Sequence, residues 1–398
     1  MKIIYLHQYF KKPSMSGGVR SYEFARRLVR DGHDVILVTS DTKNRFKSWK
    51  VEFIDGIEVH WISVPYDNSY GIFSRLWAFL KFIFLATIHC SKIKCDKIFA
   101  TSTPLTVAIP AIIMNKIKGT PYLFEVRDVW PEVPIALGVI NNKVLKWVAF
   151  WLEKVAYKNA DSIIALSIDM KKSIISRFPE CTVKVIPNAA DVNLFDTSKD
   201  DDNEELVASI NSIKEKHKFI VFYTGTFGVV NNISYIINLA SYSNGEVGFV
   251  IVGNGKERSS LEKMAKDKGV LDSIVYFLGP VIKSELYILH KYGDLACSTV
   301  LPIKELYANS ANKVFDAFAA GTPILINHGG WISKLIDNTK CGIRLDEEPS
   351  KLEFDKLYSY LSDHYSFEQS RSSSRRLGES IYNRDVLYAK FLNSIEGN

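Results

Sequence analysis

Short runs of β-branched and aliphatic residues alternate with helical patterns along the whole chain, and this alternation limits the possible folds more than any other feature. The first run, KIIYL, is followed by GGVRSYEFARRLVRDGH, in which Tyr22, Ala25 and Leu28 recur at helical spacing before a glycine. Strands separated by helices form βαβ units, which pair their strands in parallel. The sequence therefore predicts an α/β fold with doubly wound parallel sheets.

The series of strands and helices occurs twice, which predicts two domains in this chain of 398 residues. The polar stretch NAADVNLFDTSKDDDNEE separates the two series, and we interpret it as a linker with a solvated acidic face, although its carboxylates could also hold a cation. We expect an N-terminal Rossmann-like domain over residues 1–190 and a C-terminal one over residues 191–379. A last helix, at about residues 380–398, is expected to pack back on the N-terminal domain.

The charge of the chain is unevenly distributed. Residues 1–195 hold 27 Lys and Arg against 17 Asp and Glu, whereas the remainder holds 23 against 27. The basic first half indicates an anionic partner, such as lipid head groups, a phosphorylated acceptor or nucleic acid, with a chance distribution as the plainer alternative. Five scattered cysteines show no zinc-type spacing and favour a reducing, cytosolic compartment. The N-terminus reads as a first strand and not as a signal peptide.

Two aromatic, apolar segments lie in the basic half. The first, IFSRLWAFLKFIFLATIHC, is interrupted by Arg75 and Lys81, and its longest charge-free part is expected to be too short to span a bilayer. The second, KVLKWVAFWLEKVAYK, has the same character. Each could be a core helix, or a helix that lies at a membrane surface with its aromatic side chains inserted.

Two places in the first half are candidates for binding. Gly17 and Gly18 follow the first strand and open a helix, so the backbone could approach an anion there, with Arg20 available for a phosphate; a plain tight turn is the alternative. In FEVRDVWPE a strand ends in charged residues, and ligands of open α/β sheets bind beyond the carboxyl ends of strands. Asp128 could orient a sugar hydroxyl or accept its proton, or could form a structural pair with Arg127.

The second half has two glycine loops at strand ends. FYTGTFGVVNN and VGNGKERSSLE could hold a diphosphate with their backbone amides, and together they make a nucleotide site the favoured interpretation. The candidate residues of these loops are Gly225, Thr226, Gly228, Asn231, Gly253, Gly255 and Lys256.

The stretch SANKVFDAFAAGTPILI predicts a short helix that leads into a buried strand. Asn312 and Lys313 lie in the first turn of this helix, and Asp316 follows one turn later. Lys313 can neutralise a phosphate, and Asp316 can accept hydrogen bonds from ribose hydroxyls. An ordinary Lys–Asp pair on a surface helix is the alternative.

These motifs together resemble the family 4 retaining glycosyltransferases. SGGVRSYEFARRLVRDGHDVILVTS is similar to the N-terminal glycine loop and helix of the family, VIPNAADVNLF to its interdomain element, and SANKVFDAFAAGTPIL to its donor-site helix. VRDVWPE and ALGVI resemble the branch that builds bacterial surface polysaccharides, in particular the L-fucosamine-transferase-like enzymes of O-antigen and capsule synthesis. The resemblance covers nearly the whole chain and implies the GT-B fold, in which two Rossmann-like domains face a cleft.

The resemblance implies roles for the matching residues. Gly17 and Gly18 match the loop near the acceptor and the donor phosphate, and Asp128 lies where the acceptor pocket is built. Arg20, Arg127 and Trp130 are the further acceptor-binding candidates. We expect Asp128, Glu305 and Lys313 to be the catalytic residues.

The donor site departs from the family pattern at two places. Asp316 matches the second acid of a paired motif, the one that holds the donor ribose, but Ala308 replaces the first acid at the standard spacing, and Glu305 is the nearby substitute. The usual Arg and Lys after the first C-domain strand are replaced by TFGVVNN. The donor diphosphate is then left to Lys313, to Lys256 or Lys304, and to helix amides.

We therefore expect a retaining transferase that moves an N-acetylhexosamine, such as N-acetyl-L-fucosamine, from a UDP-sugar to an undecaprenyl-diphosphate-linked acceptor. It would need no cofactor and no metal, would bind no nucleic acid, and would lie peripherally on the cytoplasmic face of the inner membrane. Two alternatives remain, a GT-B sugar-nucleotide epimerase and a sugar-nucleotide-binding protein without catalytic activity.

Overall fold

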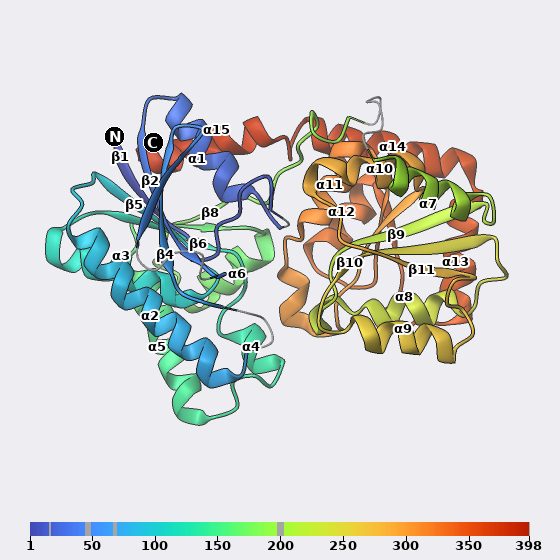
Figure 1. The fold of residues 1–398 in the computed structure, drawn as a ribbon, viewed down its shortest axis with the longest axis horizontal. Coiled ribbons are helices and arrows are strands. Elements are labelled where there is room, and N and C mark those ends of the chain that lie inside the picture. The colour runs from blue at the N-terminus through green and yellow to red at the C-terminus, as the bar shows by residue number, and fades with distance from the viewer. Residues whose placement is uncertain (16, 44–48, 67–69, 197–202, 398) are drawn as a thin grey trace. The chain divides into compact units, whose positions relative to one another are not determined.

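The computed structural model describes residues 1–398 except 16, 44–48, 67–69, 197–202 and 398. The chain divides into two compact units (Figure 1). Unit 1 consists of Met1–Lys12, Gly18–Pro187 and Tyr388–Asn398, and unit 2 of Pro13–Gly17 and Asn188–Leu387. Each unit has its own sheet with helices on both faces, which confirms the predicted doubly wound α/β class.

The sheet of unit 1 has eight strands in the order β3-β4-β2-β1-β5-β6-β7-β8. All neighbouring strands are parallel except β3 and β4, an antiparallel hairpin that turns at Asp55 and Gly56, both with positive φ. The central strands are buried on both faces, which explains why they read as continuous apolar runs. The strands are β1 (Lys2–Leu6), β2 (Asp34–Asp41), β3 (Lys50–Ile54), β4 (Ile57–Ser63), β5 (Lys97–Thr101), β6 (Tyr122–Val126), β7 (Ser162–Ala165) and β8 (Val183–Val185).

In the described part of unit 1, seven α-helices surround this sheet. They are α1 (Arg20–Arg30), α2 (Ile72–Ser91), α3 (Ala108–Lys118), α4 (Glu132–Ala136), α5 (Lys143–Asn159), α6 (Ile168–Arg177) and most of α15 (Arg384–Glu396), with a 3₁₀ turn, η1 (Leu105–Val107), before α3. The last helix is fixed to unit 1 by its aromatic residues. Phe391 stacks on Phe24 of α1 with ring centres 4.6 Å apart, and the Tyr388 hydroxyl donates a hydrogen bond to Asp31 at 2.7 Å.

The sheet of unit 2 has six parallel strands in the order β11-β10-β9-β12-β13-β14. The strands are β9 (Phe219–Thr226), β10 (Val247–Asn254), β11 (Val275–Leu278), β12 (Leu295–Ser298), β13 (Ile324–Ile326) and β14 (Gly342–Arg344). Successive residues of β9 alternate between two apolar clusters, because neighbouring side chains of a strand point to opposite faces. Phe222 belongs to one cluster and Tyr223 to the other.

The helices of unit 2 cover both faces of its sheet (Figure 1). Helices α8 (Ile233–Ala240), α9 (Arg258–Asp267) and α13 (Lys351–Ser362) pack on the face of Tyr223. Helices α7 (Glu204–Lys214), α10 (Leu286–Tyr292), α11 (Asn312–Ala320), α12 (Trp331–Thr339) and α14 (His364–Glu379) contribute to the cluster of Phe222. The described residues of the unit also form three 3₁₀ turns, η2 (Val229–Asn231), η3 (Lys283–Glu285) and η4 (Lys304–Ala308).

The expected linker is partly built into unit 2. Phe195 is fully buried in the cluster of Phe222, and Glu204 already begins α7, so a solvated linker over this whole stretch is wrong. Residues 197–202, which include most of the acidic run, lie outside the described residues.

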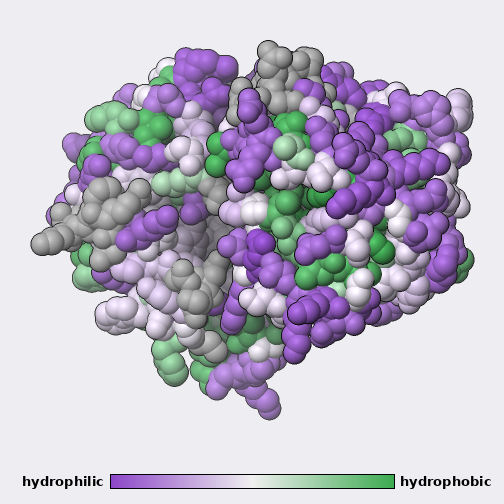
Figure 2. Space-filling view, turned by 45° about the vertical axis from the view of Figure 1, so that its right-hand side comes forward, coloured by the Kyte–Doolittle hydropathy of each residue, from purple (hydrophilic) through white to green (hydrophobic). Residues whose placement is uncertain are grey.

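The face of the molecule in Figure 2 carries mostly hydrophilic side chains with hydrophobic ones between them.

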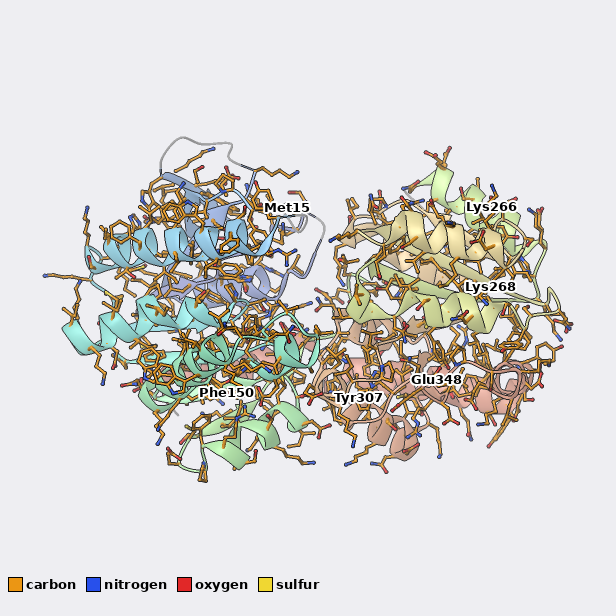
Figure 3. All side chains as sticks on the ribbon, turned by 90° about the horizontal axis from the view of Figure 1, so that it is seen from below. Met15, Phe150, Lys266, Lys268, Tyr307 and Glu348 are labelled. Carbon is orange, nitrogen blue, oxygen red and sulfur yellow. The ribbon has the colours of Figure 1, made fainter. Side chains whose placement is uncertain are left out.

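Helices α2 and α5 expose large apolar side chains. In α2 the buried residues Ala78, Phe82 and Ala86 repeat every four positions and attach one face to unit 1. The opposite face carries Trp77, which is 69% exposed, and four further exposed apolar residues, Phe73, Leu80, Phe84 and Ile88. In α5 the exposed large apolar residues lie in its first half and include Val144, Trp147, Val148, Trp151 and Phe150, which is labelled in Figure 3.

Among the described helices, the segment Phe73–Ser91 of α2 has the length and hydropathy that crossing a membrane requires. The expectation from the sequence concerned only the longest charge-free part of this segment, and it stays a prediction, because Phe73–Ser91 includes Arg75 and Lys81. The packing of Ala78, Phe82 and Ala86 in unit 1 nevertheless makes α2 a helix of the folded domain.

Candidate functional site

The sheet of unit 2 changes its winding direction between two neighbouring strands. From β9 the chain continues outward through β10 and β11, and it then returns to the other side of β9 to form β12, β13 and β14. In open parallel sheets, ligands bind beyond the carboxyl ends of the strands at such a switch point. The residues at the carboxyl ends of β9 and β12 are therefore the first to examine.

Tyr223 and Gly225 form the end of β9. Tyr223 pairs with Cys297 of β12, and β9 continues beyond this pair beside β10 alone. Gly225 has a φ of 142°, a conformation that is strained for any other residue. A Cβ at this position would lie 3.2 Å from the Tyr223 hydroxyl and 3.6 Å from Nζ of Lys313. Glycine thus leaves open the space in front of the lysine.

Lys313 reaches this strand end from the first turn of α11. Its ammonium lies 4.1 Å from the centre of the Tyr223 ring, and no described carboxylate forms an ion pair with it. Burial lowers the pKa of Lys313 to about 8, although the neighbouring thiol of Cys297 and carboxylate of Asp316 act in the opposite direction. An ammonium without a carboxylate partner at a helix N-terminus is suited to an anionic ligand.

The N-terminus of α11 is held in place but not capped. The Asn188 side chain donates a hydrogen bond to the Ser310 carbonyl at 2.6 Å, and its backbone N–H donates to the Ser310 hydroxyl at 3.3 Å. Ala311 occupies the N-cap position and offers no side-chain acceptor to the first amides. Asn312, the first residue of the helix, is exposed. The first backbone N–H groups can therefore donate to a ligand.

Asp316 faces the other cluster of unit 2. It is buried and forms an ion pair with Lys283 of η3, whose ammonium lies 4.8 Å from the centre of the Phe195 ring. Burial raises the pKa of Asp316, and the charge of Lys283 opposes this shift. Helix α11 is thus no surface helix with a simple Lys–Asp pair. The ribose-binding role of Asp316 stays a prediction, because Lys283 already contacts its carboxylate.

The two glycine loops contact each other through their backbones. A Cβ on Gly253 would lie 1.9 Å from the Gly225 carbonyl oxygen, and one on Gly255 would lie 2.3 Å from that of Phe227. Close backbone packing alone therefore explains why these two positions need glycine, whether or not they also contact a ligand. Arg258 supports the same loops, since its guanidinium donates to the Gly253 carbonyl at 3.2 Å. Lys256 is exposed.

The loop after β9 closes on itself. The carbonyl of Thr226 accepts hydrogen bonds from the Asn231 side chain at 2.9 Å, the Tyr223 hydroxyl at 3.0 Å and the Gly228 amide at 3.1 Å. Thr299, which follows β12, donates to the Asn231 carbonyl at 2.6 Å. The predicted loop residues thus shape the strand end around Lys313.

Thr299 and Asn327 are among the supporting residues that were not identified from the sequence. Thr299 follows β12, and Asn327 follows β13 and exchanges hydrogen bonds with the backbone of Val300 at 2.9 and 3.0 Å. Polar residues directly after apolar runs were the available signal. Glu305 lies exposed in η4, and Ala308 of the same turn is buried.

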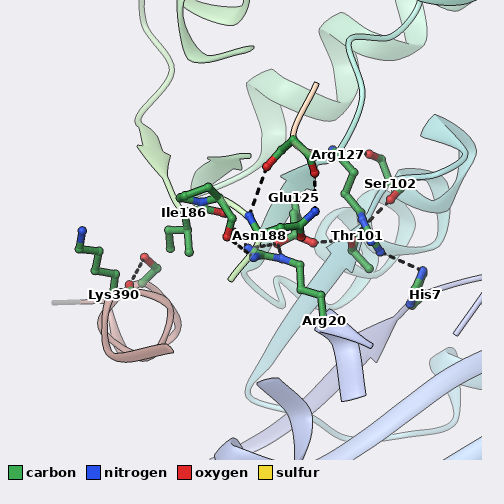
Figure 4. A network of polar contacts seen from close by, with 12 residues as sticks. His7, Arg20, Thr101, Ser102, Glu125, Arg127, Ile186, Asn188 and Lys390 are labelled. Atoms are coloured by element: carbon green, nitrogen blue, oxygen red, sulfur yellow. Dashed lines mark hydrogen bonds and ion pairs between the residues drawn. The ribbon is translucent and has the colours of Figure 1, made fainter. Parts of the chain in front are cut away.

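Unit 1 has an equivalent switch point between β1 and β5. Arg127 follows β6, and its backbone N–H donates a hydrogen bond to the Ser102 hydroxyl at 2.9 Å. Its guanidinium nitrogen lies 3.3 Å from Nε2 of His7 (Figure 4). Asp128 is exposed and accepts a hydrogen bond from the Thr103 hydroxyl at 3.1 Å. Arg127 and Asp128 thus have different partners and do not pair with each other. Trp130 is half-buried just before α4.

His7 is a further residue that sequence analysis missed. It follows β1 directly, and burial together with the charges of Arg127 and Lys11 lowers its pKa well below the usual value, so the ring is neutral. A guanidinium only donates, so Nε2 of His7 accepts from Arg127 and Nδ1 carries the proton. Among the described residues this buried Nδ1 has no hydrogen-bond partner.

Arg20 is not available for a phosphate, contrary to expectation. Its side chain is 3% exposed and forms an ion pair with the buried Glu125 at 2.8 Å. Its remaining N–H groups donate to the carbonyls of Ile186 at 2.9 Å and Pro187 at 2.5 Å (Figure 4). We assign Arg20 a structural role. Gly17, with a φ of 130°, and Gly18 lie on either side of the division between the units.

The described residues contain no group of three or more His, Cys, Asp or Glu placed to hold a metal ion.

Both halves of the chain match models of known protein families. Residues 17–194 match Glycosyltransferase Family 4, and residues 205–383 match Glycosyl transferases group 1. A curated relative, WcaI of Escherichia coli (strain K12), is named for glycosyl transfer in colanic acid biosynthesis; it is 22% identical over 97% of both chains.

Two solved structures share the fold over all of both chains. One is WaaG, a glycosyltransferase involved in lipopolysaccharide biosynthesis, with a TM-score of 0.70 and 17% identity. The other is HepE of Anabaena in complex with UDP-glucose, with a TM-score of 0.71 and 16% identity.

Proposed function

We propose that this chain transfers a sugar from a UDP-sugar to a lipid-linked acceptor. The premise is that the chain is a glycosyltransferase built of a family 4 domain and a group 1 domain, with the GT-B fold. The acceptor is an undecaprenyl-diphosphate-linked glycan of a surface polysaccharide such as O-antigen or capsule. The transferred sugar is an N-acetylhexosamine, such as N-acetyl-L-fucosamine, and its anomeric configuration is retained.

The observation that carries the donor part is the position of Lys313 at the switch point of unit 2. The Tyr223 ring and Gly225 lie next to the ammonium, which has no carboxylate partner among the described residues, and the first amides of α11 have no side-chain cap. A diphosphate would supply the missing negative charge. A nucleotide moiety would then extend along the strand ends of the sheet.

The chemistry follows from this placement. In a retaining transfer through an oxocarbenium-like state, negative charge develops on the departing diphosphate. Lys313 and the amides of α11 stabilise that charge, and this preorganised electrostatic stabilisation lowers the barrier. The departing diphosphate can accept the proton of the acceptor hydroxyl, so this chain's side chains mainly bind and orient. Asp128, exposed at the strand ends of unit 1, orients the acceptor hydroxyl.

The related proteins support the choice of substrates. HepE was solved with UDP-glucose, which favours a UDP-sugar as donor. WaaG and WcaI are named for lipopolysaccharide and colanic acid biosynthesis, which favours a surface polysaccharide as product. The L-fucosamine-transferase-like identity rests on the VRDVWPE and ALGVI motifs.

The lipid surface proposed for this protein is the exposed apolar face of α2 together with the first half of α5, named here the apolar face. It presents Trp77 and Trp147, which are 69% and 67% exposed, in the unit that contains the basic excess of the sequence. Exposed lysines at 143 and 154 flank the aromatic residues of α5. Aromatic insertion with Lys at the head groups is the pattern of helices that lie in the membrane interface.

Because one side of α2 packs in unit 1, we propose that it lies in the interface plane and does not cross the bilayer. The protein would then work peripherally on the cytoplasmic face of the inner membrane.

The testing experiment has two steps. Calorimetric binding of UDP-, GDP- and dTDP-sugars identifies the donor, and turnover with a synthetic polyprenyl-diphosphate sugar identifies the reaction. We expect binding of a UDP-sugar and formation of a longer lipid-linked glycan. Release of UDP with an epimerised free sugar would instead identify an epimerase, and donor binding without turnover would identify a non-catalytic protein.

A further inference from the structure

A buried carboxylate lies on the inner side of α5. Glu153 is 0% exposed, whereas the first half of the same helix is the exposed part that contributes to the apolar face. Its carboxylate forms an ion pair with Arg177, the last residue of α6, at 2.6 Å. A fully buried carboxylate is rare in folded proteins unless it is paired.

The same guanidinium forms a second ion pair, with Glu132, the first residue of α4. The hydroxyl of Ser173 lies between them, since it accepts from Arg177 at 3.1 Å and donates to Glu132 at 3.4 Å. Arg177 thus joins three helices, α4, α5 and α6, through charged groups. We name Glu132, Arg177 and Glu153 the triad.

The triad is better explained by the way it positions three helices than by a contribution to the stability of the fold. Desolvation of a buried ion pair offsets much of its attraction, so such pairs are poor stabilisers compared with apolar packing. Burial raises the pKa of Glu153 to about 8 and lowers that of Arg177.

The helices that the triad connects belong to two parts of the proposed function. α4 continues directly from the segment 127–131, which holds Arg127, Asp128 and Trp130 at the strand ends of unit 1. α5 carries half of the apolar face. The described structure therefore contains a short polar connection from the surface that would meet lipid to the segment that would meet the acceptor.

We propose that the triad couples the docking of α5 on a lipid surface to the ordering of the acceptor segment 127–131, with Arg177 as the positioning residue. This inference rests on the proposed function. Docking fixes the exposed half of α5 and thereby Glu153, and Arg177 passes that constraint to Glu132 at the start of α4. The enzyme would then complete its acceptor site only at the membrane, where its lipid-linked acceptor is found.

Hydrogen–deuterium exchange of peptides covering residues 127–137 tests this coupling, with and without vesicles of phosphatidylglycerol and phosphatidylethanolamine. In the unaltered protein we expect these vesicles to slow exchange in this segment at least threefold. Arg177→Met should still bind the vesicles in flotation, but its exchange in the segment should no longer respond. Glu153→Gln, which mimics the protonated acid, should keep the response.

Two further variants separate coupling from general damage. Glu132→Ala removes the α4 connection while Arg177 keeps its ion pair with Glu153, and it should also lose the response. Lys158→Met breaks the exposed pair that Lys158 forms with Glu180 at 2.6 Å, and it should respond like the unaltered protein. A vesicle response that persists in both Arg177→Met and Glu132→Ala would overturn the inference.

Two outcomes in the unaltered protein would also overturn the inference, and they can be told apart. Vesicle binding without slower exchange would contradict the coupling alone. Absence of vesicle binding would also remove the membrane part of the proposed function, while donor turnover would still be tested separately.

Discussion

The ammonium nitrogen of Lys313 lies 4.1 Å from the centre of the Tyr223 ring, at the carboxyl end of the strand where the sheet of unit 2 changes direction. A cation over an aromatic face is stabilised by roughly 0.5–2 kcal/mol, and the contact leaves its positive charge unneutralised. Asp316 lies on the same helix as Lys313, but the two form no ion pair, because Lys283 pairs with the Asp316 carboxylate. This arrangement supports Lys313 as a ligand of the donor diphosphate.

Gly225→Ala should weaken UDP binding and destabilise unit 2. The new Cβ would point toward the Tyr223 hydroxyl and the Lys313 ammonium, and the φ of 142° would be strained by about 1–3 kcal/mol. Thermal unfolding and calorimetry measure the two effects. Gly279→Ala is the matched control, because its Cβ would meet nothing within 4 Å. Equal behaviour of the two variants would contradict the close approach at Gly225.

UDP affinity should fall as pH rises above 8. Burial lowers the pKa of Lys313 to about 8 in the free protein, so above that pH a proton must be taken up before the ammonium can bind the diphosphate. Affinity should drop by up to about tenfold per pH unit until the pKa of the complex is reached. Calorimetry in buffers of different ionisation enthalpy measures the proton uptake. A Lys313→Met variant with the same alkaline decrease would assign the effect to another group.

The same shift predicts the pH dependence of stability. The pKa of Lys313 is lower in the folded than in the unfolded chain, so the unfolded chain binds more protons between pH 8 and about 10.4. This residue therefore makes the free energy of unfolding of unit 2 increase with pH in that window. Urea titrations of the unaltered protein and of Lys313→Met, compared at pH 7.5 and 9.5, isolate the contribution. A difference between the two proteins that does not change with pH would contradict it.

Trp147→Ser should weaken the binding of anionic vesicles without destabilising the protein. The ring is exposed, so its removal loses little packing, whereas its insertion into lipid would stabilise the complex by about 1.5 kcal/mol, or roughly tenfold in affinity. Flotation and tryptophan quenching by brominated lipid measure the change. Tyr365→Ser replaces an exposed aromatic residue of unit 2 and should leave vesicle binding as it is. Equal loss in both variants would speak against docking through α5.

Arg20→Met should destabilise unit 1 by about 3–5 kcal/mol, because it leaves the buried carboxylate of Glu125 without its counterion. Hydrogen exchange should become faster in peptides from β1 and β6, while peptides from β9 keep their protection. Arg376→Met, on the exposed side of α14, is the control. Unchanged protection of β6 with a loss of acceptor turnover would instead restore Arg20 as an acceptor ligand.

The fold was predictable because it depends on periodicity. The alternation of apolar runs and helical patterns determines the doubly wound class, and the stretch SANKVFDAFAAGTPILI correctly predicts helix α11 followed by strand β13. Gly321, with a φ of 70°, ends the helix as a C-terminal glycine should. These features are local, so a single sequence carries them.

The partners of the charged residues were not predictable in the same way. Arg20 pairs with Glu125, and Asp316 pairs with Lys283, in each case across a long stretch of chain. Such pairs depend on where the strands and turns come together in space, which spacing along the sequence does not give. His7 was missed for a related reason, since a lone histidine after a strand carries no local signal.

The calorimetric affinity of Lys313→Met for UDP tests the central claim most directly. We expect this variant to bind UDP about 10- to 100-fold more weakly than the unaltered protein, as the loss of a charge-assisted contact of about 1.5–3 kcal/mol implies. Lys334→Met, an exposed lysine of α12, should bind UDP like the unaltered protein. A folded Lys313→Met protein that binds UDP with unaltered affinity would contradict the account of the donor site.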